Sequence, residues 1–87
     1  MALNFPNDSR FYDATRRAVR FWGYDQSMET SFFVTEEALK HVKPDMRFDE
    51  AGLLEAFDSH RARIYAVAAK AYGRNRKGSY ELGSADF

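Results

Sequence analysis

Two neighbouring residues late in the chain, His60 and Arg61, carry side chains that could do chemistry. Arg61 lies four residues after Phe57 and four before Tyr65, so a helix would place its guanidinium within an apolar stripe. A guanidinium there is a candidate bidentate donor to an anion, but it needs a carboxylate partner or an exit to solvent. His60 is a candidate general base, although the sequence places no partner that would make a triad with it. We expect Arg61 to pair with a carboxylate, and the candidates are Asp13, Glu81, Asp86 and the chain terminus.

A second candidate site is aromatic. The stretch "VRFWGYD", residues 19–25, predicts a β-strand, in which successive side chains point to opposite faces. Val19 and Phe21 then share one face, and a second face carries large rings of its own. Such a face is capped by the chain's own ends, met by another chain, or used to hold a ligand. The candidate interaction surface consists of Arg20, Trp22, Tyr24 and Phe33.

The residues needed for several other kinds of chemistry are missing from the sequence. It has no cysteine, so it has neither disulfides nor thiolate sites, and two histidines are too few for an ordinary metal site without carboxylates. The phosphate-binding and zinc-protease motifs G-x-x-x-x-G-K-[ST], G-x-G-x-x-G and H-E-x-x-H do not occur. We therefore predict no catalytic residue, no metal, no cofactor and no enzymatic activity.

The charge distribution gives a nucleic-acid alternative. The 13 basic and 13 acidic residues balance, which argues against a surface built wholly for nucleic acid. Basic residues nevertheless cluster early and late in the chain, and rings interleaved with arginine are typical of single-strand binders. This alternative uses the sheet surface with Arg16, Arg17, Arg20 and the run Arg74–Lys77.

Sequence patterns also predict the elements that position these residues. Residues 10–13, 18–24 and 28–34 are rich in aromatic and β-branched side chains and are separated by short polar stretches, which predicts an antiparallel meander. Residues 80–82 form a further strand candidate. Thr35 is a helix N-cap before residues 36–42, and Pro44 ends that helix.

The strongest helical signal begins at Asp49, a good N-cap. From there an amphipathic pattern continues to Gly73, a candidate left-handed C-cap. A helix of about 24 residues would be roughly 36 Å long, whereas strands of five or six residues span about 17–20 Å. The helix must therefore bend or overhang the sheet.

These elements predict an α+β fold, in which a small antiparallel sheet, a three-strand meander plus a C-terminal strand, packs against one short and one long helix. The 87 residues are expected to form a single domain, 1–87. No apolar run approaches the roughly 20 residues that span a bilayer, and the N-terminus lacks the pattern of a signal peptide. We expect a cytoplasmic protein that does not bind membranes.

The chain resembles a bacterial family known as domain of unknown function 1488. The similarity lies in "FPNDSRFYDATRRAVRFWGYD", "SFFVTEEAL", "EAFDSHRARIYAVAAKAYGR" and the closing "YELGSADF". The resemblance implies an α+β fold, with a small sheet packed by helices, in a cytoplasmic bacterial protein. It carries over no catalytic or binding residue.

The leading hypothesis is a non-enzymatic binding or regulatory module that forms a homodimer through the second sheet face or the end of the long helix. The first alternative is nucleic-acid binding by basic and aromatic residues of the sheet. The second is an anion-binding or catalytic role around Arg61 and His60. No small-molecule ligand is indicated.

Overall fold

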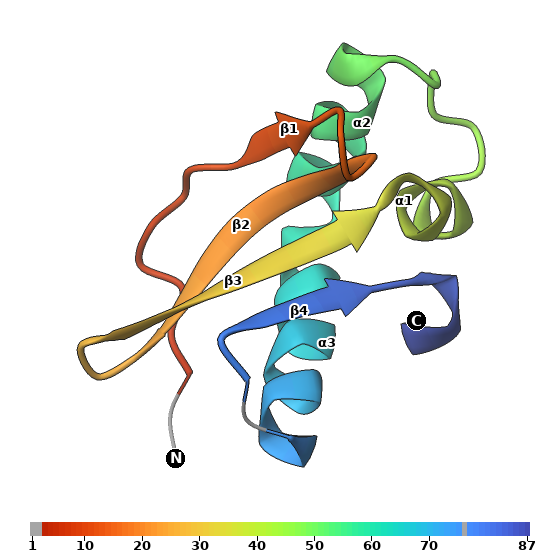
Figure 1. Ribbon diagram of the computed structural model, residues 1–87. Helices are drawn as coiled ribbons and strands as arrows, with labels where there is room; N and C mark the ends of the chain where they lie inside the picture. Colours follow the sequence, from red (N-terminus) through yellow and green to blue (C-terminus); the bar gives the residue numbers. More distant parts are fainter. Residues whose placement is uncertain (1–2, 76) are drawn as a thin grey trace.

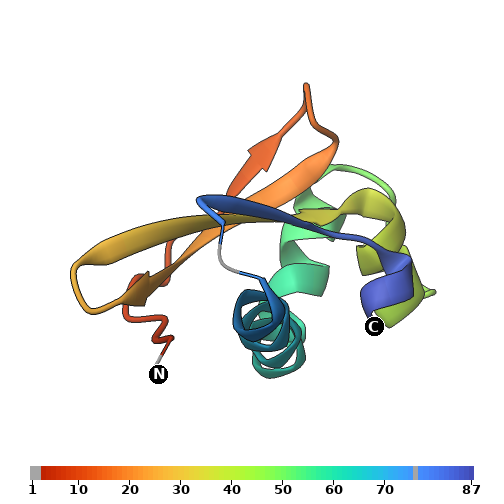
Figure 2. The ribbon, with the colours of Figure 1, turned by 60° about the horizontal axis from the view of Figure 1, so that its bottom comes forward.

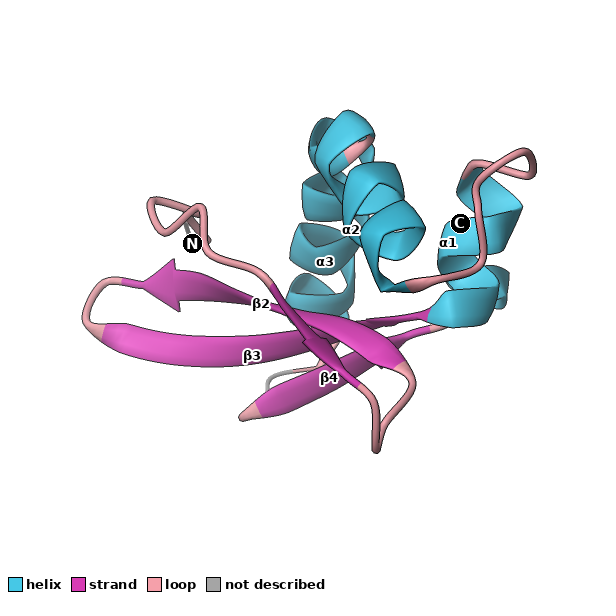
Figure 3. Ribbon diagram, turned by 90° about the horizontal axis from the view of Figure 1, so that it is seen from above, coloured by secondary structure: helices cyan, strands magenta, loops and turns pink. Residues whose placement is uncertain are grey.

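The computed structural model describes residues 3–75 and 77–87, and within them four strands form one sheet that helices cover on one face (Figures 1 and 3). The elements in chain order are β1 (Phe11–Asp13), β2 (Ala18–Asp25), β3 (Met28–Thr35), α1 (Glu36–Val42), α2 (Glu50–Ser59), α3 (Arg61–Arg74), β4 (Ser79–Leu82) and the short 3-10 helix η1 (Ser84–Asp86). The α+β prediction is therefore confirmed.

The sheet has the strand order β1-β2-β3-β4, and one of its strands runs in a direction that differs from the prediction. The first three strands form the predicted antiparallel meander, but β4 runs parallel to β3, with Ser31 opposite Ser79 and Val34 opposite Leu82. The prediction of a purely antiparallel sheet was therefore wrong. Three helices separate β3 from β4, and such a long crossover allows a strand to return in the same direction.

Two tight connections fix the register of the meander. The β2–β3 hairpin turns at residues 26–27, where Gln26 has a φ of 58°, and the β1–β2 turn ends at Arg17 with a φ of 54°. Positive φ at both positions provides the backbone twist that a short antiparallel connection needs. The register then places Arg20 opposite Phe33 and Phe11 opposite Arg20.

The core lies between the sheet and the helices. Figure 2 shows all three helices on one side of the sheet, with α3 seen nearly end-on. Side chains from the strands and from the helices meet there. The largest fully buried side chains are Phe21, Phe32, Phe57, Leu39, Leu53, Ile64, Leu82, Val19 and Val34.

Both predicted N-caps are confirmed. The Thr35 hydroxyl accepts a hydrogen bond from the Ala38 N–H at 3.0 Å, and Asp49 Oδ1 accepts one from the Gly52 N–H at 2.7 Å. Each cap satisfies one backbone donor that has no partner within its own helix. The starts of α1 and α2 are therefore fixed by local sequence.

The predicted long helix was wrong, because the chain breaks it at His60. His60 has φ −128° and ψ 27°, and its N–H bonds to the Phe57 carbonyl at 3.1 Å instead of continuing the helical ladder. The Ser59 hydroxyl and His60 Nδ1 both lie close to the Ala56 carbonyl, at 3.3 and 3.2 Å. Side chains that compete for a helical carbonyl favour such a break. Two helices of about 15 and 21 Å replace the single rod of about 36 Å.

The predicted left-handed C-cap at Gly73 was also wrong. Helix α3 continues to Arg74, and the cap residue is Asn75, whose N–H bonds to the Ala71 carbonyl at 3.3 Å. No described glycine has a positive φ. Gly73 therefore sits inside the helix.

The N-terminal segment covers the open edge of the core beside α3. Asn4 and Tyr24 exchange two backbone hydrogen bonds of 2.8 Å, which extends the sheet next to β2. The Phe5 ring stacks on the Tyr65 ring with centroids 4.1 Å apart and an interplanar angle of 2°. Leu3, Phe5 and Phe87 all pack against the core cluster, so these end segments lie on the helix side of the sheet.

Candidate interaction surface

The sheet has one face that no described helix covers, and Figure 1 looks onto it. We call it the outer face. Its members follow from the strand register, because residues paired across an antiparallel or parallel ladder share a face. They are Phe11, Asp13, Arg20, Trp22, Tyr24, Glu29, Ser31, Phe33, Ser79 and Glu81. The structure thus brings together all four residues of the predicted surface.

Rings and guanidinium groups alternate across the outer face. The Arg20 guanidinium lies 5.2 Å from the Trp22 ring centre and 5.4 Å from the Phe33 ring centre, so it bridges the two rings. Arg16 lies 3.8 Å from the Phe33 ring centre. Phe33 is consequently only 5% exposed, although it points away from the core. Cation–π contacts of this kind cover part of the aromatic surface.

Arg20 is held in this arrangement by one side-chain hydrogen bond. Its Nη2 donates to Ser31 Oγ at 2.9 Å, while its Nε is buried and has no hydrogen-bond partner among the described residues. A buried donor without an acceptor costs free energy. The position of Arg20 is therefore stabilised by the flanking rings and by Ser31, not by a carboxylate.

The other rings of the outer face are accessible. Phe11 is 60% exposed, and Trp22 and Tyr24 are half-buried. The Tyr24 hydroxyl donates to Glu29 Oε2 at 2.7 Å, which anchors that ring across the strand pair. The sequence analysis did not include Phe11, because the register of the three-residue strand β1 depends on the β1–β2 turn.

Arg61 is paired with a carboxylate of its own chain, but not with a predicted one. Its Nη2 donates to Asp58 Oδ1 at 3.0 Å and to the Asp8 carbonyl at 2.8 Å, and its Nη1 donates to the Tyr65 hydroxyl at 2.6 Å. Among the ion pairs of the described residues, none joins Arg61 to the expected partners Asp13, Glu81, Asp86 or the chain terminus. Asp58 lies one helical turn earlier, at the i,i+3 spacing that brings two side chains together on a helix, so the sequence spacing could have indicated this pair.

Asp58 joins the N-terminal segment to the helix break. Arg10 donates from Nε and Nη2 to the two oxygens of Asp58, at 3.0 and 2.8 Å. This bidentate hydrogen bond from Arg10, with the charges of Arg10 and Arg61, holds the pKa of Asp58 below its usual range against the opposing effect of burial. A surface depression of about 510 Å³ adjoins the cluster, and its lining includes Ser9.

His60 is oriented by its own helix. Its Nδ1 lies 3.2 Å from the Ala56 carbonyl and 3.0 Å from Ser59 Oγ. That nitrogen therefore lies within hydrogen-bond distance of two groups of its own helix end. These contacts are those of a residue that ends a helix, because His60 is the C-cap of α2.

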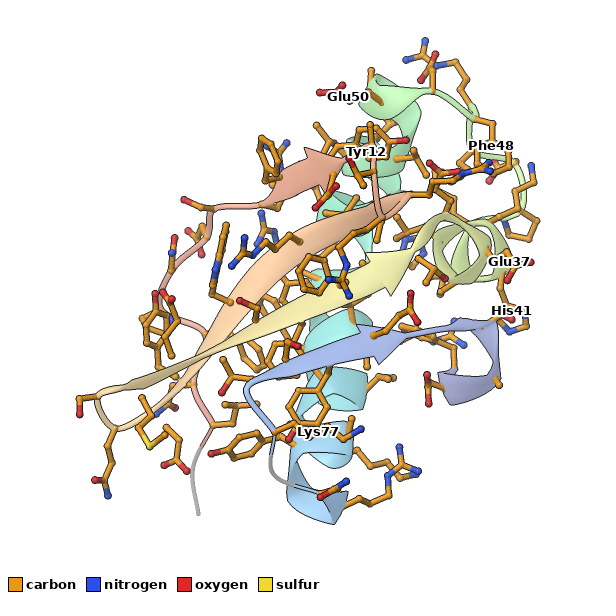
Figure 4. All side chains as sticks on the ribbon, in the orientation of Figure 1. Tyr12, Glu37, His41, Phe48, Glu50 and Lys77 are labelled. Atoms are coloured by element: carbon orange, nitrogen blue, oxygen red, sulfur yellow. The ribbon has the colours of Figure 1, made fainter. Side chains whose placement is uncertain are left out.

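A polar cluster that sequence analysis did not identify lies where β3 meets α1. The Tyr12 hydroxyl donates to Glu36 Oε2 at 2.5 Å, and Arg17 Nη2 donates to Glu36 Oε1 at 3.3 Å. The hydrogen bond to the Glu36 carboxylate raises the pKa of Tyr12. Phe48, 58% exposed on the loop between α1 and α2 (Figure 4), borders two depressions beside this cluster.

The basic residues of the nucleic-acid alternative lie in two separate places. Arg16 and Arg17 follow β1, whereas Lys77 precedes β4 at the opposite end of the molecule from Tyr12 (Figure 4). The register separates the two groups by about six residues along the strands, or roughly 20 Å. Arg74 lies 4.0 Å from Asp86, and Arg76 falls outside the described residues.

Within residues 3–75 and 77–87, no group of three or more His, Cys, Asp or Glu side chains could hold a metal ion. In the same part of the chain, no helix is both long enough and apolar enough to cross a membrane.

The fold and its uncovered face define a small α+β protein with a four-stranded mixed sheet and helices on one side. Residues 3–82 match the family model described as "Protein of unknown function (DUF1488)". The chain therefore belongs to the DUF1488 family, which confirms the resemblance seen in the sequence.

A solved structure supports the same fold. The chain is similar to a protein of unknown function from the DUF1488 family of Shewanella loihica PV-4, with a TM-score of 0.81 and 18% sequence identity. The similarity covers 92% of this chain and 90% of that one. No curated protein matches the sequence.

Proposed function

We propose that the protein is a non-enzymatic binding module that forms a homodimer through the outer face of its sheet. The observation that carries the proposal is an aromatic sheet face that no described helix covers. Phe11 is 60% exposed there, Trp22 and Tyr24 are half-buried, and the end segments pack on the opposite side. Contiguous exposed rings typically mark an interaction site.

The chemistry of the face suits a protein partner. Trp, Tyr, Phe and Arg are the residue types enriched in protein–protein interfaces, because they combine large apolar area with a polar group. The Arg20 guanidinium already lies against Trp22 and Phe33, so little of its side-chain freedom remains to be lost on binding. Two symmetric copies of one such face form the commonest kind of oligomer.

The arrangement of the polar residues supports a non-enzymatic role. The guanidinium of Arg61 already donates to Asp58, Asp8 and Tyr65, so few of its N–H groups remain for an anion. His60 Nδ1 is turned toward a backbone carbonyl of its own helix. The cytoplasmic location and the absence of membrane, cofactor and small-molecule binding stay predictions from the sequence.

The test compares two phenylalanines of nearly equal exposure on different surfaces. Sedimentation equilibrium of the wild type should give twice the chain mass of 10.1 kDa. Phe11→Ala and Trp22→Ala should shift the protein toward the monomer. Phe48→Ala, on the loop between α1 and α2, should leave the dimer unchanged.

A monomeric wild type across the accessible concentration range would overturn the proposal. So would an equal effect of Phe11→Ala and Phe48→Ala, because it would show that the outer face has no special role. Far-UV circular dichroism of each variant separates loss of association from loss of folding.

Nucleic-acid binding is the second candidate, favoured by the Arg20 guanidinium beside the Trp22 ring. Against it, the outer face also carries Asp13, Glu29 and Glu81, which repel phosphates. Titration of labelled single- and double-stranded oligonucleotides at two salt concentrations tests it. Binding that weakens with salt and is lost in Trp22→Ala would favour this candidate over the homodimer.

A further inference from the structure

The outer face holds charges of both signs that form no ion pair with any residue of the ranges 3–75 and 77–87. Among the described residues, no opposite charge lies within 4.0 Å of any of them, although ion pairs occur elsewhere on the surface. The basic members are Arg20 and the adjacent Arg16, and the acidic members are Asp13, Glu29 and Glu81. Such a face can provide both halves of an ion pair to an identical face.

The strand register arranges these residues in rows that run across the sheet. One row reads Arg20 on β2, Phe33 on β3 and Glu81 on β4. Neighbouring strands are about 4.8 Å apart, so Arg20 and Glu81 are about 10 Å apart, on either side of β3. A positive and a negative side chain therefore flank the same central strand.

The next row places a large side chain opposite small ones. It reads Trp22 on β2, Ser31 on β3 and Ser79 on β4. The indole projects from one side of the central strand, while Ser79 leaves space on the other side. Both rows are thus asymmetric about β3, one in charge and the other in size.

One symmetry operation places the positive end of the first row opposite its negative end, and the large side chain of the second row opposite its small one. Consider two outer faces that stack around a two-fold axis parallel to β3 and midway between the faces. Each row then lies opposite the same row of the second copy, and β2 of one copy lies opposite β4 of the other. Arg20 then faces Glu81 of the second copy, and Trp22 faces Ser79 of the second copy. Phe33 faces Phe33 of the second copy, so the Arg16 guanidinium that covers this ring must turn aside when the faces meet. Stacked sheets pack about 10 Å apart with nearly aligned strands, which is the geometry that this axis produces.

We propose that the homodimer is a face-to-face sheet sandwich in which Arg20 of each copy pairs with Glu81 of the other and the Trp22 ring occupies the space above Ser79 of the other. The inference rests on the proposed function, because it assigns the orientation of that same dimer. It makes Arg20, Glu81 and Ser79 the residues that select this orientation.

Charge reversal tests the pairing. Arg20→Glu and Glu81→Arg should each raise the dimer Kd by about tenfold or more, because like charges then face each other. The double variant Arg20→Glu/Glu81→Arg restores opposite charges and should return the Kd to near the wild-type value. Failure of the double variant to recover, while the wild type is dimeric, overturns this orientation.

Cysteine trapping provides a second measurement that does not depend on affinity. The chain has no cysteine, so an Arg20→Cys chain mixed with a Glu81→Cys chain reports one contact only. A thiol-reactive crosslinker that spans about 10 Å, the spacing of stacked sheets, should yield a linked heterodimer, and the matched control Arg20→Cys with Glu37→Cys, on α1, should not.

Equal trapping of Glu37→Cys and Glu81→Cys would contradict the inference. A wild type that is monomeric would instead overturn the proposed function itself.

Discussion

The guanidinium of Arg16 lies 3.8 Å from the centre of the Phe33 ring and covers it from the solvent side of the sheet. The β1–β2 turn sets this position, because Asp13 Oδ1 accepts a hydrogen bond from the Arg16 N–H at 3.1 Å and the following residue has a positive φ. A charged residue of a turn thereby buries an aromatic residue on the face opposite the core. Phe33 is 5% exposed as a result.

Arg16→Ala should uncover Phe33 and lower the free energy of unfolding by about 0.5–1 kcal/mol, the usual contribution of an exposed cation–π contact. Urea denaturation monitored by circular dichroism measures the change. Thr15→Ala, at an exposed position of the same turn, is the control. An equal loss in both variants would assign the effect to the turn and not to the ring contact.

Tyr12→Phe should destabilise the protein, because it removes a donor from the largely buried Glu36 carboxylate. The pKa of Tyr12 is raised by its hydrogen bond to Glu36, so this contribution is present below about pH 10, near the unfolded pKa, and is lost as pH rises through the folded pKa. Stability curves of both proteins should therefore converge at alkaline pH. Curves that stay parallel there would contradict the assignment.

Asp58→Asn should lower the free energy of unfolding at neutral pH by about 1 kcal/mol, because the half-exposed carboxylate holds both Arg10 and Arg61. The folded pKa of Asp58 is depressed, so its stabilisation is present above the unfolded pKa of about 3.9 and disappears as pH falls through the folded value. Denaturation series from neutral to strongly acidic pH test this. Asp45→Asn, whose carboxylate is far more exposed, should have a smaller effect at every pH.

Gly52→Ala should destabilise the chain by roughly 1–3 kcal/mol, although alanine is the better helix former. A Cβ at Gly52 would lie 2.0 Å from the Arg47 carbonyl oxygen and 2.7 Å from its carbon, so the backbone before α2 would have to move. Thermal unfolding checks the sign. A neutral or stabilising substitution would show that residues 47–49 relax freely, against the close contact observed.

Local signals account for the parts of the fold that the sequence predicted well. The alternation of residues 18–24 and 28–34 predicted β2 and β3, and with them the shared face of Arg20, Trp22, Tyr24 and Phe33. The Thr35 and Asp49 caps predicted where α1 and α2 begin. In each case the interacting groups lie within a few residues of one another, so periodicity and capping rules apply directly.

The candidate site was only partly predictable for the same reason. Phe11 and Glu81 join the outer face through strands of three and four residues, which are too short for a periodic signal. The contact of Arg16 with Phe33 depends on a turn conformation that composition does not specify.

By itself, the sequence determined where the strands lie along the chain, the starts of α1 and α2 directly after their N-caps, and the existence of an aromatic second face. Tertiary structure decided the parallel entry of β4 beside β3, the interruption of the long apolar pattern at His60, and the choice of Asp58 as the common partner of Arg10 and Arg61. The pairing of Arg10 with Asp58 joins groups 48 residues apart, and its energy appears only once the chain has closed around its core. Hydrophobic periodicity reports which side of an element is buried, but it does not report which distant charge or strand will lie beside it.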